Sequence, residues 1–140
     1  MTPKEYLTQI RTLGLLIDQR QKELDRLHEQ KFGAVSGIDY SKIPVKGSRR
    51  VGASFEQAAI KTLDLTAEIA GLIMEYTDLK HKIIGEIQSL DRPEYIQILY
   101  ARYVENKRLG DIAAEMNYEY DYARKLHGRA LQEFGRRFLQ

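Results

Sequence analysis

Apolar residues recur every three or four positions along most of the chain, which is the spacing of one face of an α-helix. Residues 3–31 contain one such stripe, made of Tyr6, Ile10, Leu13, Ile17, Leu24 and Leu27. Residues 54–90 contain a stripe with heptad spacing, made of Ala58, Thr62, Leu65, Ile69, Leu72, Tyr76, Leu79, Ile83 and Leu90. The pattern predicts two long helices. Pro3 is expected in the first turn of one helix, and Ser54 with Gln57 forms a predicted capping box for the other.

The segment between these helices, from about residue 32 to residue 53, has no helical period. Gly33 and Gly37 are predicted to end the first helix. Four cations and no acid lie between residues 41 and 54, namely Lys42, Lys46, Arg49 and Arg50. Connections longer than about 12–15 residues are uncommon unless they are functional or mobile. We therefore expect a long basic loop with partial disorder.

The second helix has more apolar surface than one partner helix can cover. Its stripe is widened by Ile60, Leu63, Ile73, Ile84 and Ile87. Two helices joined by a loop fold back on each other, so the first helix is the simplest partner for the stripe. The remaining apolar surface is expected to pack on a second copy of the protein, which predicts a homodimer.

A third section begins at the break 89–93, where Asp91 is predicted to cap a new helix. Three short helical patterns follow, each with one apolar face. The first face consists of Ile96, Leu99, Tyr100 and Tyr103, and the second of Leu109, Ile112, Ala113 and Met116. The third face consists of Tyr122, Ala123, Leu126, Ala130, Leu131, Phe134 and Phe138. The predicted fold class is all-α. A long antiparallel, coiled-coil-like hairpin in residues 1–90 precedes a small three-helix domain in residues 91–140.

The last two helical patterns have the frame of a helix-turn-helix. This motif needs a small residue where its helices cross, which Ala113 supplies, and a turn residue that tolerates left-handed dihedrals, which Asn117 supplies. Tyr118 can point inward from the turn, and Ala123 and Leu126 can face the core from the second helix. The frame predicts that this second helix crosses the first and enters the major groove of duplex DNA.

Composition limits the class of protein further. The chain is 43% apolar and 30% charged, has no cysteine, and has no apolar run long enough to cross a bilayer. Its start has no secretory signal, so a cytoplasmic protein with no membrane partner is expected. The net charge is only +2, but from residue 122 onward five cations face one acid. Local positive charge of this kind attracts phosphate.

No motif indicates catalysis. The three histidines are too scattered for a metal site, and the sequences HExxH and GxSxG do not occur. Lys46 stands beside a Gly-Ser pair, but the upstream glycine of a phosphate-binding loop is missing. We therefore expect no enzyme activity, no cofactor and no metal.

Residues 95–137 resemble region four of the sigma-70 family, which reads the promoter −35 element. The matching motifs are Asp111-Ile112-Ala113, the turn Met116-Asn117-Tyr118, and Arg129-Ala130-Leu131. The preceding residues 98–103 look like the helix that packs beneath them in that family. The chain as a whole, with its helical hairpin, resembles phage-encoded transcriptional regulators of the ArpU and RinA kind.

These resemblances imply a phage or prophage transcription activator in the cytoplasm and nucleoid of a bacterial host. Double-stranded DNA is the expected partner, and host RNA polymerase is a second expected partner. Two alternatives stay open. One is the small subunit of a phage DNA-packaging terminase, for which a ring larger than a dimer is expected. The other is a sigma-like module that docks on RNA polymerase without binding DNA.

The predicted DNA-binding residues lie on the outer side of the last helix and are Tyr120, Asp121, Arg124, Lys125, Gly128 and Arg129. Further candidates for phosphate contact are Lys107, Arg108, Lys46, Arg49 and Arg50. The sequence departs from the sigma family at the start of this helix, where Glu119 and Asp121 repel phosphate. Base reading there would use Tyr120, or Asp121 as an acceptor from cytosine.

Overall fold

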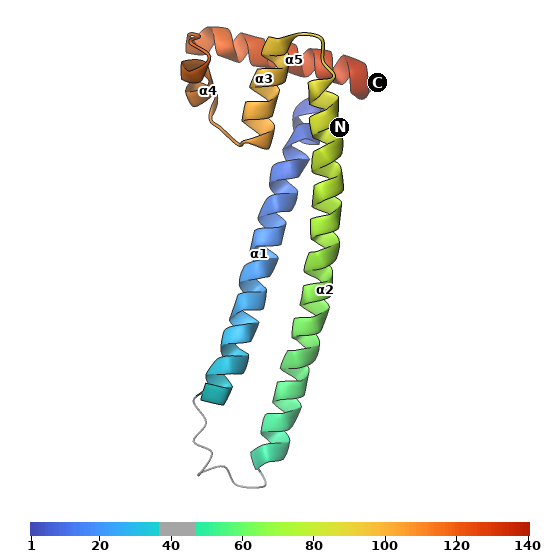
Figure 1. The fold of residues 1–140 in the computed structure, drawn as a ribbon, viewed down its shortest axis with the longest axis vertical. Coiled ribbons are helices and arrows are strands. Elements are labelled where there is room, and N and C mark those ends of the chain that lie inside the picture. Colours follow the sequence, from blue (N-terminus) through green and yellow to red (C-terminus); the bar gives the residue numbers. More distant parts are fainter. Residues whose placement is uncertain (37–46) are drawn as a thin grey trace. The chain divides into compact units, whose positions relative to one another are not determined.

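The computed structural model describes residues 1–36 and 47–140, with the side chains of residues 1–29 and 54–140. These described residues contain helices and no strand, which confirms the all-α prediction. In chain order the elements are α1 (Pro3–Ser36), α2 (Gly47–Gln88), α3 (Pro93–Leu99), the π-helical turn η1 (Tyr100–Val104), α4 (Leu109–Glu115) and α5 (Tyr120–Phe138) (Figure 1).

The two long helices extend further into the predicted loop than expected. Helix α1 continues to Ser36 and α2 begins at Gly47, so the loop boundaries at 32 and 53 and the capping box at Ser54 were wrong. A glycine inside a helix costs only about 1 kcal/mol relative to alanine, and Gly33 therefore does not end α1. The expected disorder concerns residues 37–46, which lie outside the described residues.

The chain forms two compact units, and their boundary differs from the predicted one at residue 90. The head unit comprises residues 1–14 and 75–140, and the hairpin unit comprises residues 15–74. Each unit contains a stretch of both long helices. The two divisions differ because the last turns of α2 and the first turns of α1 share one core with the C-terminal helices.

In the hairpin unit, α1 and α2 pack through the predicted stripes. Leu24, Leu65 and Ile69 are buried together, with Leu27 against them. Beside this cluster the Arg20 guanidinium lies 3.3 Å from the Glu68 carboxylate. An exposed ion pair of this kind contributes less than about 1 kcal/mol, so the apolar contacts hold this part of the hairpin together.

The head unit has a single core to which all its elements contribute. Its buried side chains include Leu7, Ile10, Ile83, Ile87, Ile98, Leu99, Ile112, Leu126, Ala130 and Phe134. Helix α5 packs against both α3 and α4, and Figure 1 shows it running across them. Phe134 is completely buried at the centre, where its ring lies 5.8 Å from that of Tyr6 and 4.9 Å from that of Phe138.

Three features fix the first turn of α1, one within the turn itself and two that connect it to α2 and α5. Thr2 and Glu5 form a capping box, with the Glu5 N–H donating to the Thr2 hydroxyl over 3.1 Å. The Tyr6 hydroxyl donates to the Glu86 carboxylate, and burial together with this hydrogen bond raises the pKa of Tyr6. A Cβ added at Gly135 would lie 2.6 Å from the Pro3 ring, so α1 and α5 approach closely there.

The break before α3 differs from the prediction in its capping residue. Arg92, not Asp91, occupies the N-cap position, with φ −100° and ψ 121°. The reason is Pro93, which occupies the first turn of α3 and restricts the residue before it to extended dihedrals. Asp91 lies outside the helix, with its carboxylate 3.6 Å from the Arg137 guanidinium.

Candidate nucleic-acid interface

Helices α4 and α5 are joined by a tight turn that forms the predicted helix-turn-helix. Asn117 has φ 60°, the left-handed conformation expected of it, and Ala113 is 3% exposed. The Tyr118 N–H donates to the Ala113 carbonyl over 2.8 Å, which closes the turn against α4. The small side chain of Ala113 thus lies where the chain folds back, as the frame requires.

The conformation of Asn117 yields a stability prediction. Left-handed dihedrals cost alanine about 1 kcal/mol or more, whereas glycine adopts them freely. Asn117→Ala is expected to lower the free energy of unfolding by about 1 kcal/mol, and Asn117→Gly to change it by less than about 0.5 kcal/mol. Urea unfolding followed by circular dichroism measures both. Equal stability of the alanine and glycine variants would contradict the assigned turn.

The buried face of α5 consists of Ala123, Leu126, Ala130 and Phe134. Tyr122, predicted on this face, is instead 46% exposed, and its ring meets that of Tyr118 edge to face with centroids 4.8 Å apart. Successive residues are rotated by about 100° around a helix, so Tyr122 lies beside the buried stripe rather than in it. The prediction for this one residue was wrong.

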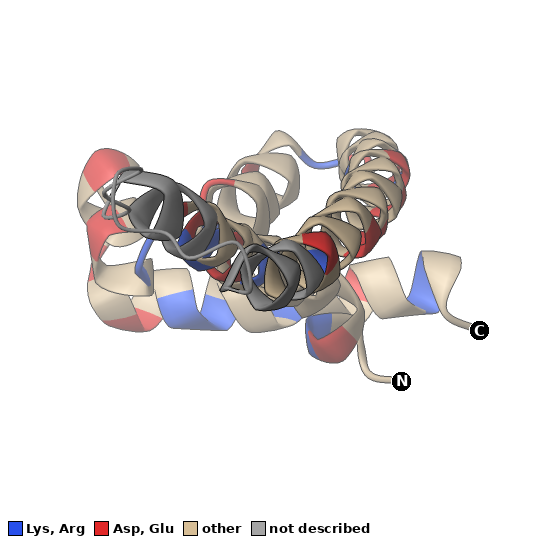
Figure 2. Ribbon diagram, turned by 90° about the horizontal axis from the view of Figure 1, so that it is seen from below, with Lys and Arg blue, Asp and Glu red and all other residues tan. Residues whose placement is uncertain are grey.

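The remaining surface of α5 contains the predicted DNA-binding residues. All six are exposed, namely Tyr120, Asp121, Arg124, Lys125, Gly128 and Arg129. Figure 2 shows Lys and Arg positions recurring along this helix, which ends near the C label. Within the described residues, the charged groups of Arg124, Lys125 and Arg129 have no carboxylate or hydrogen-bond partner. These three cations are therefore available to an anionic ligand.

Other predicted or nearby cations are already paired. The Lys107 ammonium lies 3.4 Å from Glu105 and 3.0 Å from Glu115, and the Glu115 hydrogen bond is the main cause of its raised pKa. The Arg136 guanidinium lies 2.6 Å from Glu133. Lys107 is thus paired with two carboxylates of the same unit, and its expected phosphate contact stays a prediction.

The other expected phosphate contacts differ in their positions. Arg108 is exposed at the N-cap of α4, one residue before that helix begins. Arg49 and Arg50 lie at the beginning of α2, in the hairpin unit, and so belong to a different compact unit from α5. Lys46 lies outside the described residues. Only Arg108 therefore joins the cations of α5 in the head unit.

Negative charge gathers at the start of α5. Glu119 is its N-cap residue and Asp121 lies in its first turn, where a carboxylate interacts favourably with the helix dipole. The Glu119 side chain makes no capping hydrogen bond to the helix. The exposed surface of α5 thus changes along its length, from acidic in the first turn to basic over residues 124–129.

A partly buried polar pair connects η1 to the middle of α5. The Tyr103 hydroxyl lies 2.8 Å from His127 Nε2, and the two rings stack with centroids 5.6 Å apart. Burial, followed by the charges of Arg102 and Lys4, lowers the pKa of His127 to about 4. The partners are 24 positions apart in the sequence, and no pattern in the residues between them could have shown this contact in advance.

This pair makes stability depend on pH. The unfolded pKa of His127 is near 6.5 and the folded pKa is about 4, so the unfolded state binds more protons between these values. Stability present at pH 7 is therefore lost as the pH falls through this range. Because the ring is only partly shielded from solvent, the expected loss is about 2 kcal/mol at pH 4.

The check is urea unfolding at pH 7 and about pH 4 of the parent and of His127→Gln. The glutamine can keep the hydrogen bond to Tyr103 but has no titrating group, so this variant should lose clearly less stability on acidification. An equal loss in both proteins would show that His127 does not cause it. Carboxylates titrate in both proteins, so they cancel in the comparison.

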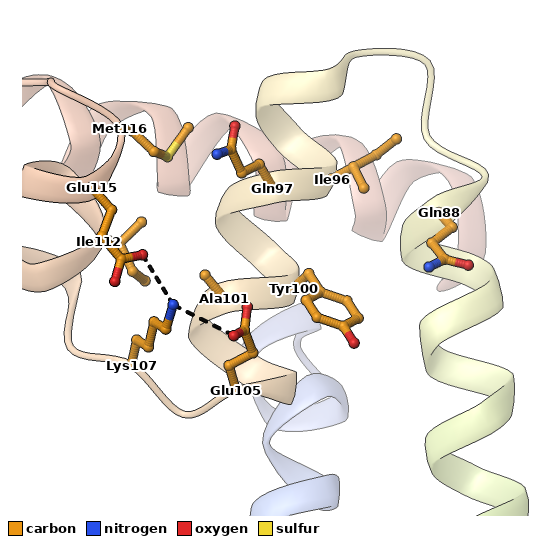
Figure 3. A pocket seen from close by; sticks show the side chains of 10 residues that line it. All are labelled: Gln88, Ile96, Gln97, Tyr100, Ala101, Glu105, Lys107, Ile112, Glu115 and Met116. Atoms are coloured by element: carbon orange, nitrogen blue, oxygen red, sulfur yellow. Dashed lines mark hydrogen bonds and ion pairs between the residues drawn. The ribbon is translucent and has the colours of Figure 1, made fainter.

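A hollow of about 400 Å³ lies between the end of α2, η1 and α4 (Figure 3). Its apolar lining includes Ile96, Ile112 and Met116, and the Lys107 ion pairs cross one side of it.

No group of three or more metal-ligating side chains was found among the described residues. In the described helices, no stretch is apolar and long enough for a bilayer.

Comparison of the chain with protein-family models, with curated proteins and with solved structures finds no match. Any assignment of function therefore depends on the helix-turn-helix geometry, the exposed cations and the sequence resemblance to sigma region four.

Proposed function

We propose that this protein is a sequence-specific DNA-binding transcription activator of phage or prophage origin, with α5 as its recognition helix. The observation that carries the proposal is the positive charge of Arg124, Lys125 and Arg129, which have no carboxylate partner in the described part of the chain and lie on the exposed side of the second helix of the helix-turn-helix. By contrast, Lys107 and Arg136 are paired with carboxylates. Natural DNA-binding motifs place such a helix in the major groove.

Each exposed residue of α5 has a role in this proposal. Arg124 is suited to a bidentate contact with guanine, while Lys125 and Arg129 neutralise phosphates and set the register on the duplex. Asp121 can accept a hydrogen bond from the amino group of cytosine. The acidic first turn then disfavours sites that would place a phosphate beside it, which adds to discrimination between sequences.

Selection of binding sites from a random duplex library, with the full chain, tests the proposal. A shared sequence is expected to be enriched. Fluorescence anisotropy with this duplex should show affinity that falls with salt, with a log–log slope of about −2 for the two phosphate contacts of Lys125 and Arg129. Absence of any enriched sequence, together with no binding at low salt, would overturn the proposal.

The acids Glu119 and Asp121 favour a second candidate, in which the sigma-like module docks on RNA polymerase without DNA. For this function, capture of polymerase by the immobilised protein should be insensitive to salt, and DNA affinity should be absent. The same anisotropy experiment therefore separates the two candidates.

A further inference from the structure

Helix α2 is apolar on two sides within the hairpin unit. Between residues 57 and 74 its charged residues are Lys61, Asp64 and Glu68. At about 100° per residue, these three fall within an arc of roughly 60° on the helix surface. The side that contains Leu65 and Ile69 packs against α1. The rest of the circumference has no charged residue in this stretch.

A second stripe lies on this uncharged surface, roughly 150° around the helix from the seam with α1. This outer stripe consists of Ile60, Leu63, Ala67, Ala70 and Met74, which are spaced alternately by three and four residues. Ile60 is 59% exposed, Leu63 70% and Met74 69%, although each is a large apolar side chain. A helix that is apolar on two opposite sides is normally covered on both.

The size of the outer stripe fits the needs of a weak to moderate dimer. A fully exposed large apolar side chain presents on the order of 100 Å², so the three large residues and two alanines expose roughly 300 Å². Interfaces are about 60% apolar, which implies about 500 Å² per copy once polar neighbours are included. The total of about 1,000 Å² reaches the lower limit for a specific interface.

We propose that a second copy of this chain covers the outer stripe, with α2 packed against α2 about a two-fold axis. The stripe is self-complementary, because heptad spacing in both helices lets large residues interlock and the central alanines allow close approach. No charged side chain of the stripe has to lose its hydration when the contact forms, since the stripe contains no charged residue. This proposal concerns the hairpin unit and does not depend on DNA binding.

Analytical ultracentrifugation of the full chain tests the proposal. The parent should be dimeric at 100 µM, and Leu63→Glu should raise the self-association Kd at least 100-fold with unchanged helix content by circular dichroism. The matched control is Gln57→Glu, which adds the same charge on the arc of Lys61, Asp64 and Glu68 and should leave the Kd unchanged. A monomeric parent, or an assembly that survives Leu63→Glu, overturns the proposal.

The absence of cysteine from the chain allows a second, independent test. Ala67→Cys should form an interchain disulfide on mild oxidation, because residue 67 lies at the centre of the proposed contact. Glu68→Cys, one position away on the charged arc, should cross-link at least tenfold more slowly. Equal cross-linking rates would overturn the proposal even if the protein is dimeric. Since no DNA is present, either result leaves the proposed transcription role to be decided by its own experiment.

Discussion

Phe134→Ala is expected to lower the free energy of unfolding of the head unit by about 4 kcal/mol, the cost of removing a fully buried aromatic ring. The ring has no exposed surface and contacts the rings of Tyr6 and Phe138. Its removal leaves a cavity where the first turns of α1 meet α5. Because α1 and α5 are each held by contacts with other helices, they cannot move far enough to fill this cavity.

Urea unfolding followed by tyrosine fluorescence and circular dichroism measures this change. Gln132→Ala is the matched control, because residue 132 is on the same helix and exposed, and it should change stability by less than about 0.5 kcal/mol. A loss below about 2 kcal/mol for Phe134→Ala would mean that α5 does not depend on this core. Its orientation over α4 would then need another explanation.

Combined substitution Arg124→Ala and Lys125→Ala is expected to weaken binding to the selected duplex about 100-fold, or about 2.7 kcal/mol. One guanine contact and one phosphate contact are lost, each worth about 1–2 kcal/mol. The log–log slope of affinity against salt should become shallower by about one, because only Lys125 of the two contacts a phosphate. The melting temperature should not change, because both side chains are exposed.

The control for this experiment is the double variant Arg136→Ala and Arg137→Ala. It removes the same charge from the same helix, but Arg136 is paired with Glu133 and Arg137 lies 3.6 Å from Asp91. DNA affinity should fall less than threefold in this variant. If the two double variants weaken binding equally, α5 attracts DNA only through its total charge, and the assigned recognition surface is wrong.

The sequence predicted well those parts of the fold that depend on repeated apolar spacing or on the backbone dihedrals that a residue type allows. The heptad stripe predicted the seam at Leu65 and Ile69, because a helix must bury a continuous apolar face. Asn117 predicted the turn, because few residues adopt left-handed dihedrals. Gly33 was misleading, since the small helical penalty of glycine is easily offset by the rest of a long helix.

The candidate site was predicted less completely, because the sequence shows which residues are charged but not which of them form ion pairs. The sequence assigned Arg124, Lys107 and Arg136 similar positive charge, but among the described residues the fold brings carboxylates to the last two and none to the first. Glu86 interrupts the heptad stripe without apparent reason until Tyr6 is seen to donate to it across 80 residues. Such contacts follow from the tertiary fold, which local pattern does not encode.

The head unit combines residues 1–14 with residues 75–140, and this has a consequence for synthesis. During translation the first turns of α1 leave the ribosome long before α5 exists, so Leu7 and Ile10 remain without their final neighbours until almost the entire chain has emerged. The hairpin unit, which is contiguous, can assemble earlier. A fragment that starts at residue 91 would lack part of the core and should not fold alone, so studies of the recognition helix need both ends of the chain.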